Sequence, residues 1–477
     1  MPGKTKYEEI AGKVAALINS GVLQVEQRIP SLRAMSNQSG TSVMTVMQAY
    51  RLLEDQGMIE SRPQSGYYVR HDYYRQRPAA FMPEAQIQPL KTEAEEVRIS
   101  SIIEKLVKPV DYEHIIPLGS GLQDSSFYPS EQLSIHLSRV IRSDPAGLNC
   151  YCFEAGHEAL RWELARRMIE AGCNTSPEEI IVSVGASQAL YISLKTLTKP
   201  GDAIAVESPG YYGFYALMER LQLRAVEIPC DPQTGLSLSA LETVLQRDED
   251  IRCVLLSANL SNPTGASMPE HSKQIMADLC KKHRVPIIED DVYGELAFAL
   301  LRPRALKSYD PENIIYVGSM SKTLAPGYRI GWIAAGKYQQ QVLDYYRCTV
   351  MSATLPTQMA VASFLKSGGM AHHLRRMHKA HRENMLNLQN KIAASFPNGT
   401  RISNPLGGYF IWVELPEPVD SVILAERLLK QNISIAPGII FSVGGHYRNF
   451  MRLNCALQWG PRLESAIEAI AAEVKRF

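Results

Sequence analysis

The chain has 477 residues, more than one hydrophobic core usually covers, so we expect more than one domain. A net charge of +1 neither requires nor excludes nucleic acid, because a small basic module is compatible with a neutral whole. The eight cysteines are scattered, and only Cys150 and Cys152 are close, without a second Cys or His pair to complete a zinc site. We therefore expect neither a metal site nor disulfides.

No segment of the sequence is typical of a membrane protein. Residues 1–10 lack the apolar stretch of a signal peptide, and no run approaches the roughly 20 uninterrupted apolar residues of a membrane helix. We expect a cytoplasmic protein without a membrane partner.

Residues 1–72 are predicted to form a small domain of three helices and two strands. The first helix is expected over residues 6–21, where apolar residues recur at helical spacing before a closing glycine. The second is expected over residues 28–40, with Pro30 in its first turn and Gly40 at its end.

The third helix is expected over residues 41–57, and residues 58–69 are expected to form two strands around a turn at Pro63 to Gly66. One face of this helix is predicted to be apolar and to consist of Val43, Val46, Met47, Tyr50 and Leu53. Three helices followed by a hairpin are typical of a winged helix-turn-helix, whose third helix enters the major groove of DNA. A three-helix bundle that binds another protein is the alternative.

This segment resembles the GntR family of bacterial DNA-binding domains, through "RIPSLR", "TSVMTV" and "GYYV". The resemblance implies that the domain binds a double-stranded DNA operator. The residues that it places at the DNA are Arg33, Ser42, Thr45 and Gln48, with Gly66 at the tip of the wing and Ser42 also capping the helix. The family often has an arginine where Met44 stands.

Residues 73–113 are predicted to be a linker between this head and a larger body. They are rich in proline, glutamine and charged residues, and no helical or strand period appears before about Ile99 to Val107. A linker of this length lets two DNA-binding heads reach spaced half-sites.

Residues 114–477 are predicted to form an α/β body with a largely parallel sheet. Short apolar runs without alternation are typical of strands that are buried on both faces. Such runs occur at residues 179–185, 202–209, 251–259, 285–291 and 313–321, with helical patterns such as 187–197 and 270–283 between them.

A polar cluster accompanies the end of each of these runs. In chain order the clusters read "VGASQAL", "SPGYYGF", "SNPTG", "EDDVYGE" and "SMSKT". Ligands of such sheets bind beyond the carboxyl ends of the strands, so we expect the clusters to form one site. The first cluster also offers a helix N-terminus to an anion.

Lys322 lies in the last of these clusters, in an apolar and tightly turned stretch. Burial favours the neutral form of a lysine, and a neutral amine is the nucleophile that condenses with aldehydes. Pyridoxal phosphate offers such an aldehyde, a ring nitrogen that a carboxylate keeps protonated, and a dianionic phosphate. The clusters contain a residue type suited to each part, although each residue alone also fits a structural role.

From about Pro117 onward the chain resembles the fold-type I aminotransferases, which are α/β pyridoxal phosphate-dependent transferases with a smaller α+β C-terminal subdomain. The resemblance implies that Lys322 binds the aldehyde, that Asp290 pairs with the ring nitrogen, and that Tyr211 stacks on the ring. It implies that Asn262 and Tyr293 bond to the phenolic oxygen. The phosphate would be held by Ala186, Ser187, Gln188, Ser319 and Arg329.

The same resemblance implies a homodimer with a shared site. Tyr151 matches a tyrosine that reaches the phosphate from the neighbouring subunit. Arg452 matches the arginine that binds the α-carboxylate of an amino acid, and its planar fork suits that role.

A GntR-type head, a long linker and an aminotransferase-like body together resemble the MocR subfamily of transcriptional regulators over essentially the whole chain. This implies a homodimeric regulator, often domain-swapped, that uses pyridoxal phosphate to sense a small amino compound or the cofactor itself. Relatives carry a second arginine near the ring-stacking tyrosine, but Gly213 stands in that vicinity here, so a dicarboxylate-like or γ-amino acid effector is less supported. The alternatives are an active aminotransferase with an accessory head, and a scaffold that binds neither DNA nor cofactor.

Overall fold

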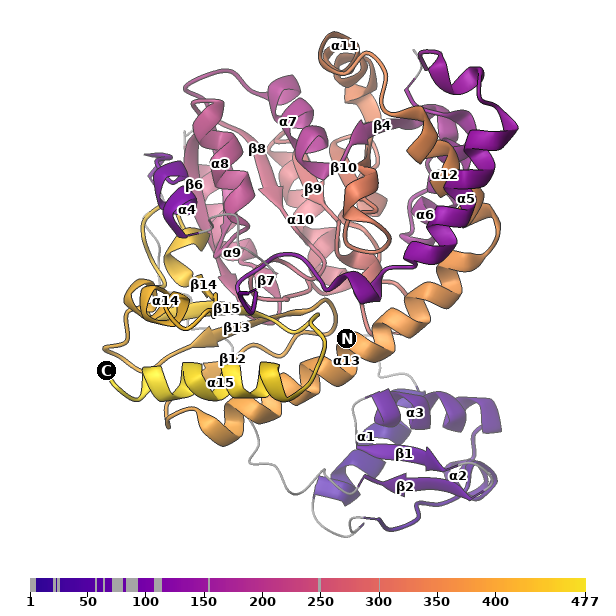
Figure 1. Ribbon diagram of the computed structural model, residues 1–477, viewed down its shortest axis with the longest axis vertical. Coiled ribbons are helices and arrows are strands. Elements are labelled where there is room, and N and C mark those ends of the chain that lie inside the picture. Colours follow the sequence, from indigo (N-terminus) through magenta and orange to yellow (C-terminus); the bar gives the residue numbers. More distant parts are fainter. Residues whose placement is uncertain are drawn as a thin grey trace. The chain divides into compact units, whose positions relative to one another are not determined.

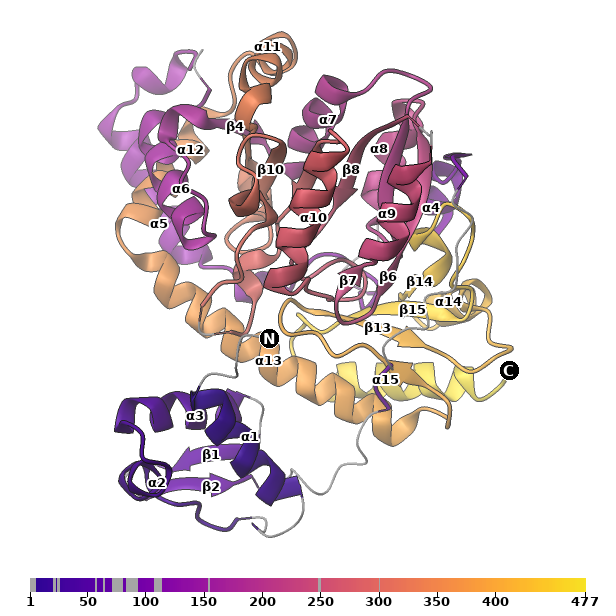
Figure 2. The ribbon, with the colours of Figure 1, turned by 180° about the vertical axis from the view of Figure 1, so that it is seen from behind.

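The chain divides into two compact units, Met1–Pro78 and Ala79–Phe477, which we describe separately (Figures 1 and 2). The structure is a computed structural model. It describes residues 6–19, 23, 26–55, 58–62, 65–70, 80–82, 93–106, 114–152, 155–247, 250–299 and 301–477.

The smaller unit contains three helices and a hairpin, as predicted. The helices are α1 (Lys6–Asn19), α2 (Leu32–Ser39) and α3 (Val43–Asp55), and β1 (Ile59–Arg62) pairs antiparallel with β2 (Gly66–Val69). Their shared core includes Val14, Ile18, Val46, Tyr50, Leu53, Ile59 and Val69. Gly21, Gly57 and Pro63, which the sequence analysis placed at turns and helix ends, lie outside the described residues.

Helix α2 begins at Leu32, two residues after Pro30. The Ser31 hydroxyl accepts a hydrogen bond from the Ala34 N–H at 3.2 Å, so Ser31 is the N-cap and Pro30 precedes it. The prediction that Pro30 lies in the first turn is therefore wrong. The predicted end at Gly40 is confirmed, because this residue has a φ of 64° in the left-handed region.

Helix α3 begins after Ser42, whose hydroxyl accepts a hydrogen bond from the Thr45 N–H at 3.1 Å. The predicted helix cap is thus present. Val46, Tyr50 and Leu53 are buried, but Val43 is 42% exposed. The predicted apolar face was wrong for Val43, because this residue opens the helix at its solvent-exposed end.

The larger unit is built on a mainly parallel sheet (Figure 1). Its strands are hydrogen-bonded in the order β6 (Arg224–Asp231), β5 (Ala203–Ser208), β8 (Ile251–Leu256), β9 (Ile287–Asp290), β10 (Ile314–Ser319), β11 (Ile330–Ala334) and β4 (Ile180–Val184). Strand β11 runs antiparallel to both neighbours, whereas β6, β5, β8, β9 and β10 run parallel to one another. The short β7 (Gly235–Leu236) pairs with β6. The largely parallel sheet is confirmed, although the sequence analysis did not predict β6 or β11.

Helices cover both faces of this sheet (Figures 1 and 2). Ile204 and Val206 of β5 share a core with α7 (Ala186–Leu197) and α8 (Tyr212–Arg220). Ala203 and Ala205 of the same strand share a core with α9 (Leu238–Gln246) and α10 (Glu270–Lys282). The strands are therefore apolar on both sides, and polar side chains gather at their ends.

Further helices flank the β4 side of the sheet. Helix α12 (Leu355–Lys366) packs on α5 (Ser130–Ser143) and α6 (Glu158–Glu170), and α11 (Gln339–Thr349) packs on α7.

The C-terminal part of the unit forms the smaller α+β subdomain that the resemblance implied. Its antiparallel sheet has the order β12 (Arg401–Ile402), β13 (Phe410–Glu414), β15 (Phe450–Asn454) and β14 (Ala436–Pro437). The helices α13 (Gly369–Ser395), α14 (Ser421–Leu429) and α15 (Pro461–Val474) share a core with it.

Part of the predicted linker packs on this subdomain. The Met82 N–H donates to the Ile402 carbonyl at 2.8 Å, and the Ile402 N–H donates to the Ala80 carbonyl at 3.0 Å. Phe81 thereby forms a parallel bridge with Ile402, at the β12 edge of the sheet.

A second part of the predicted linker packs on the mainly parallel sheet. Strand β3 (Glu95–Glu96) pairs antiparallel with β6, and α4 (Ser100–Leu106) follows it. The buried side chains here are Val97 and Ile99. The described residues of this segment thus differ from the predicted linker, because their apolar side chains are covered by the larger unit. The rest of the predicted linker lies outside the described residues.

From the sequence we expect no membrane helix, no metal site and no disulfides. Within the ranges given above, no helix is long and apolar enough to cross a membrane. The same ranges contain no group of three or more His, Cys, Asp or Glu residues placed to hold a metal ion. All eight cysteines fall in these ranges and are free thiols.

Candidate functional site

Lys322 lies in the turn that follows β10. Its Nζ donates a hydrogen bond to the Gly121 carbonyl at 2.9 Å and lies 5.8 Å from the centre of the Tyr293 ring. Its own carbonyl accepts a hydrogen bond from the Gln123 side chain at 2.6 Å. Gly121 and Gln123 lie 201 and 199 residues earlier in the chain, so tertiary structure fixes this lysine.

The surroundings of Lys322 favour its neutral form. Burial and then the positive charge of Arg452 lower the pKa of the Lys322 amine to about 8, while the Asp290 carboxylate opposes the shift. The nucleophilic amine is therefore far more populated near neutral pH than it is for an exposed lysine. The same interactions place Lys322, Asp290 and Arg452 within electrostatic reach of one another.

Two adjacent carboxylates at the end of β9 differ in their surroundings. Asp291 is paired, since Arg302 forms an ion pair with it and the Asn259 amide donates to it at 3.1 Å. Asp290 is buried, and its Oδ1 has no hydrogen-bond partner among the described residues. Burial, followed by the charge of Asp291, raises the pKa of Asp290 to about 7. Asp290 is thus the carboxyl that is available to share a proton with a ligand.

Helix α7 begins at the first polar cluster. Gly185 has a φ of 81°, a conformation that favours glycine. The N–H groups of Ala186, Ser187 and Gln188 open the helix and have no acceptor in a preceding turn. The Gln188 side chain accepts a hydrogen bond from the Val184 N–H at 2.7 Å, so its backbone N–H is the group that remains for an anion.

Arg329 lies beside this helix start. Its Nη2 donates to the Val184 carbonyl at 3.2 Å, and a Cβ on Gly185 would come within 2.3 Å of the same nitrogen. Gly185 therefore makes room for the guanidinium. A helix N-terminus with an arginine next to it is suited to bind a phosphate group.

Ser319 ends β10, and Ser321 lies in the turn between β10 and β11. The Ser319 hydroxyl donates to the Ile330 carbonyl at 3.2 Å and accepts from the Ser321 N–H at 3.1 Å, so it shapes the turn. The Ser321 hydroxyl lies 3.5 Å from Nη1 of Arg329. Ser321 is not among the residues predicted for the phosphate, although its hydroxyl is the one in contact with Arg329.

The three predicted ring contacts follow three different strands. Tyr211 follows β5, Asn262 follows β8, and Tyr293 follows β9. Burial raises the pKa of the Tyr211 hydroxyl, and Tyr293, Asp290 and Arg452 also act on it electrostatically. The structure therefore brings Tyr211 together with these groups at the carboxyl edge of the sheet.

Arg452 of β15 is the residue predicted for a carboxylate, and it is 1% exposed. Its Nη1 donates to the Asn262 side-chain oxygen at 2.8 Å, and its Nη2 donates to the Gly119 carbonyl at 2.7 Å. Its guanidinium lies 4.2 Å from the centre of the Phe410 ring and 5.2 Å from that of Phe441. In the described part of the chain its Nε has no hydrogen-bond partner, and the acceptors of its two Nη atoms are neutral oxygens rather than carboxylates. A buried cation without an anion is costly, so the arrangement suits the carboxylate of a ligand.

A segment that the sequence analysis missed, residues 119–123, contacts both charged groups. The carbonyl of Gly119 bonds to Arg452, and the carbonyl of Gly121 bonds to Lys322 and to the Tyr409 hydroxyl, the latter at 3.1 Å. No motif predicts this, because backbone carbonyls make the contacts and any residue type supplies them.

Tyr151 is the residue predicted to reach the phosphate of the neighbouring subunit. It is 69% exposed and lies between the short helix η2 (Gly147–Asn149) and α6. The contact of Tyr151 with the site of a second subunit stays a prediction.

The predicted DNA-contacting residues lie in the smaller unit. They are exposed or half-buried and comprise Arg33, Ser42, Thr45 and Gln48. Gly66 has a φ of 113°, and a Cβ there would lie 3.2 Å from Nε of Arg28. Arg28 forms a bridge with Tyr68 of β2 and is an exposed basic residue at the wing that the sequence analysis missed.

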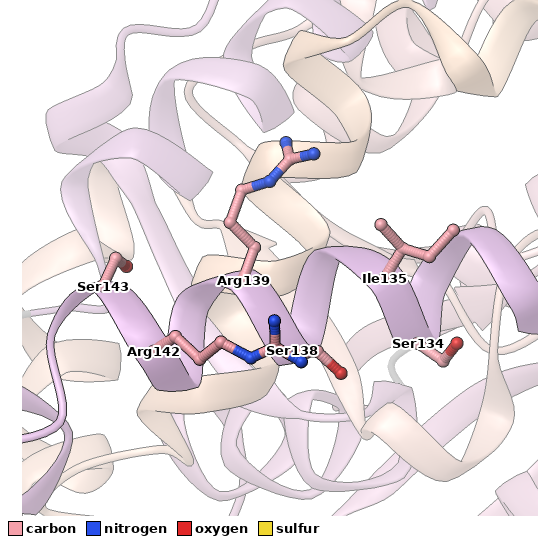
Figure 3. A pocket seen from close by; sticks show the side chains of 6 residues that line it. All are labelled: Ser134, Ile135, Ser138, Arg139, Arg142 and Ser143. Carbon is pink, nitrogen blue, oxygen red and sulfur yellow. The ribbon is translucent and has the colours of Figure 1, made fainter.

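Two hollows in the larger unit contain none of the predicted cofactor residues. One, of about 580 Å³, runs along α5 and is lined by Ser134, Ile135, Ser138, Arg139, Arg142 and Ser143 (Figure 3). The other, of about 590 Å³, lies between residues 115–125 and 457–463. The second hollow nevertheless adjoins the site, because Gln123 lines it and donates to the Lys322 carbonyl.

The residues at the carboxyl edge of the sheet fit pyridoxal phosphate. The amine of Lys322 suits the aldehyde, and the buried Asp290 with its unbonded oxygen suits the ring nitrogen. The start of α7 and Arg329 suit the phosphate.

Comparison with known proteins matches both parts of the chain. Residues 122–470 match a family described as aminotransferase class I and II, and residues 6–69 match one described as bacterial regulatory proteins, gntR family. Two uncharacterised HTH-type transcriptional regulators of Escherichia coli (strain K12) match nearly the whole chain. YjiR is 35% identical over 99% of this chain and 99% of its own, and YdcR is 36% identical over 98% of each.

The larger unit also matches solved structures. The structure of LysN, the α-aminoadipate aminotransferase of Thermus thermophilus, in complex with N-(5'-phosphopyridoxyl)-L-leucine, is 27% identical to this chain. The match covers 80% of this chain and 96% of LysN, with a TM-score of 0.73.

Proposed function

Since the chain belongs to the aminotransferase class I and II family and, over its full length, to the transcriptional regulators of the MocR arrangement, we propose that it senses an amino compound at Lys322 and Arg452. The protein is a DNA-binding regulator that depends on pyridoxal phosphate. We propose which residues bind the cofactor and the effector, and how binding of the effector alters binding of the DNA.

One observation carries the proposal. A lysine with a lowered pKa, a buried carboxyl with an unbonded oxygen and a buried guanidinium without a carboxylate act on one another electrostatically. These are the three groups that an amino acid and pyridoxal phosphate need together. If these groups were only structural, the absence of a hydrogen-bond partner for Asp290 Oδ1 and for Arg452 Nε among the described residues would be unexplained.

When bound, pyridoxal phosphate supplies an aldehyde that condenses with amines and a ring that withdraws electrons. Asp290 would hold a proton at the ring nitrogen, and Tyr211 would lie against the ring face. Asn262 and Tyr293 would bond to the phenolic oxygen. The phosphate would be held by Arg329, Ser319 and the N–H groups of Ala186, Ser187 and Gln188.

The effector would be bound by two groups. Arg452 would bind its carboxylate through two parallel hydrogen bonds, and Lys322 would exchange a proton with its amine. Arg452 lies on the smaller subdomain but bonds to Asn262 of the larger sheet, so an incoming carboxylate competes with a bond that joins the two. A ligand shifts the arrangement of the subdomains only by its different affinity for each arrangement.

We further propose a homodimer in which the partner's Tyr151 completes the phosphate site. We also propose that this dimer is domain-swapped. Two heads in one dimer would reach two half-sites of an operator, through Arg33, Ser42, Thr45, Gln48 and Gly66. Such a regulator would act in the cytoplasm, where the DNA is.

The test is the variant Lys322→Ala. It is expected to lose the visible absorbance of the lysine-bound cofactor and every response of DNA binding to amino acids, while DNA affinity without an effector is unchanged. Lys199→Ala, in an exposed loop, is the control and is expected to behave as the wild type. An effector response that persists in Lys322→Ala contradicts the proposal.

An active aminotransferase is the second candidate. The observation that favours it is the same lowered pKa of Lys322, because a neutral amine is able to move protons between carbon and solvent. Incubation of the holoprotein with a panel of amino acids and a keto acid, with product detection, tests this function. Failure to form a new keto acid across the panel removes it.

A further inference from the structure

Glu227 of β6 is a buried carboxylate, 6% exposed, that accepts four hydrogen bonds. Its Oε1 accepts from the Ser208 hydroxyl at 2.7 Å and from the Val443 N–H at 3.0 Å. Its Oε2 accepts from the Ser442 hydroxyl at 3.1 Å and from the Gly444 N–H at 3.0 Å. Each carboxylate oxygen thus accepts one hydrogen bond from a hydroxyl and one from a backbone N–H.

These bonds join the mainly parallel sheet to a loop of the smaller subdomain. Ser208 ends β5, whereas residues 442–444 follow the short helix η8 (Gly438–Phe441). Phe441, at the end of that helix, also bonds to the sheet side, because its carbonyl accepts from the Gly210 N–H at 3.0 Å.

Both ends of this connection lie next to groups of the proposed site. Gly210 precedes Tyr211, the predicted ring-stacking residue. The Phe441 ring lies 5.2 Å from the Arg452 guanidinium. The loop that Glu227 holds therefore adjoins the ring-stacking residue at one end and the carboxylate-binding residue at the other.

We propose that Glu227 is a positioning residue that sets the distance between the Arg452 site and the Tyr211 loop by holding residues 441–444 against the sheet. This inference rests on the proposed function in one respect, namely that Arg452 receives a carboxylate. Glu227 itself contacts neither ligand, and it acts through Phe441 and Gly210.

The pattern of donors makes Glu227→Gln a sharp test. In either orientation of the amide, its NH₂ group replaces one oxygen and faces the N–H of Val443 or Gly444. A hydroxyl rotates to accept a hydrogen bond, but a backbone N–H does not, so one loop amide loses its acceptor. The variant keeps the size of the side chain.

Glu219→Gln is the matched control. Glu219 accepts the N–H groups of Ile99 and Ser100 on the same oxygen, at 2.8 and 2.7 Å. A glutamine carbonyl retains both bonds, so this variant removes a charge from the same unit without releasing an amide.

Two probes are used with the full-length holoprotein, each titrated by the change in visible absorbance. Propionate carries a carboxylate without an amine and reports on Arg452, whereas propylamine carries an amine without a carboxylate. For Glu227→Gln, we expect propionate to bind about tenfold more weakly, in line with one lost hydrogen bond to a charged group, and propylamine to bind within about twofold of wild type. Glu219→Gln is expected to match wild type with both probes.

If Glu227→Gln binds both probes equally more weakly, the inference is overturned, because the effect is then a general destabilisation of the protein. If the binding of neither probe changes, the inference is also overturned, because the position of the loop then does not affect the Arg452 site. If Glu227→Gln does not fold, Ser442→Ala replaces it, since it removes one neutral donor and is expected to weaken propionate by about threefold. Unchanged propionate binding in a folded Ser442→Ala then overturns the inference.

Failure of the proposed function has a different signature. In that case Arg452→Gln binds propionate as the wild type does, whatever Glu227→Gln does. Loss of binding in Arg452→Gln with no effect in Glu227→Gln overturns the role of Glu227 alone.

Discussion

The Arg452 guanidinium donates to the side-chain oxygen of Asn262 at 2.8 Å. Arg452 belongs to the smaller subdomain, and Asn262 follows β8 of the mainly parallel sheet. The residue predicted for the effector's carboxylate is thus bonded to a residue predicted to contact the cofactor ring. On the proposed function, binding of an effector at Arg452 would therefore change the surroundings of the cofactor directly.

Arg452→Gln is expected to weaken binding of propionate by about 100-fold, which corresponds to about 3 kcal/mol for a buried charged contact. The variant is expected to unfold at a temperature no lower than wild type, because it removes a buried charge that lacks an anion. Titration of the holoprotein and thermal unfolding check the two parts. The control is Arg427→Gln, whose guanidinium also lies over a ring, 4.4 Å from the centre of Phe477. Equal effects of the two substitutions on propionate binding would count against the assignment.

Cofactor uptake by the apoprotein is expected to depend on pH through Lys322. Uptake needs the neutral amine, and burial lowers the pKa of that amine to about 8. The uptake rate should therefore rise about tenfold per pH unit below this value and level off above it. Stopped-flow absorbance between about pH 6 and pH 10 measures the profile. A rate that keeps rising to the ordinary pKa of lysine would show that the amine is not desolvated.

Gly185→Ala is expected to weaken pyridoxal phosphate binding by about tenfold, because its Cβ would displace the Arg329 guanidinium from the start of α7. Gly201→Ala is the control, since Gly201 has a similar φ of 90° but no atom within 4 Å of the added Cβ. Both variants share a backbone strain of about 1 kcal/mol, so their thermal stabilities should fall alike. Equal cofactor affinities in the two variants would remove Arg329 from the phosphate site.

Met44→Arg is expected to strengthen DNA binding and to steepen its dependence on salt by about one unit of the logarithmic slope, as one added phosphate contact does. Met44 is 61% exposed at the start of α3. Ile169→Arg adds the same charge at a residue of α6 that is 62% exposed, and it should leave the slope unchanged. Mobility-shift titrations at several salt concentrations measure both. An unchanged slope in Met44→Arg would place this part of α3 away from the DNA.

Mixed dimers test the shared site. A dimer of one Lys322→Ala chain and one Tyr151→Ala chain contains one complete site only if the partner's Tyr151 serves Lys322. The purified mixed dimer is expected to show about half of the wild-type cofactor absorbance, whereas each variant alone shows less. Recovery no greater than the average of the two separate variants would place Tyr151 in the site of its own chain.

The groups predicted for the site come together in the structure because they follow strands. Asp290 and Lys322 each close or follow a buried apolar run, and the parallel order of the strands brings their ends together. The predicted anion site at the start of α7 has the same basis, since Gly185 marks the turn from strand to helix.

The sequence does not predict contacts that depend on the backbone or on distant segments. Gly119 and Gly121 contact Arg452 and Lys322 through their carbonyls, and 333 and 201 residues separate the partners. Glu227 lies in β6, a strand that the sequence analysis did not identify. Gln188 illustrates a third limit, because its side chain bonds to the neighbouring Val184 N–H rather than remaining for a ligand.

Main-chain hydrogen bonds hold residues 80–82 on Ile402 of β12. The Met82 side chain adds to this attachment, because it is buried in a cluster with Trp412 and Phe441. Strand β12 and the Arg452 strand, β15, both pair with β13. The covalent path from the body to the DNA-binding head therefore starts on the sheet that carries the guanidinium, and a displacement of that sheet moves the starting point of this path with it.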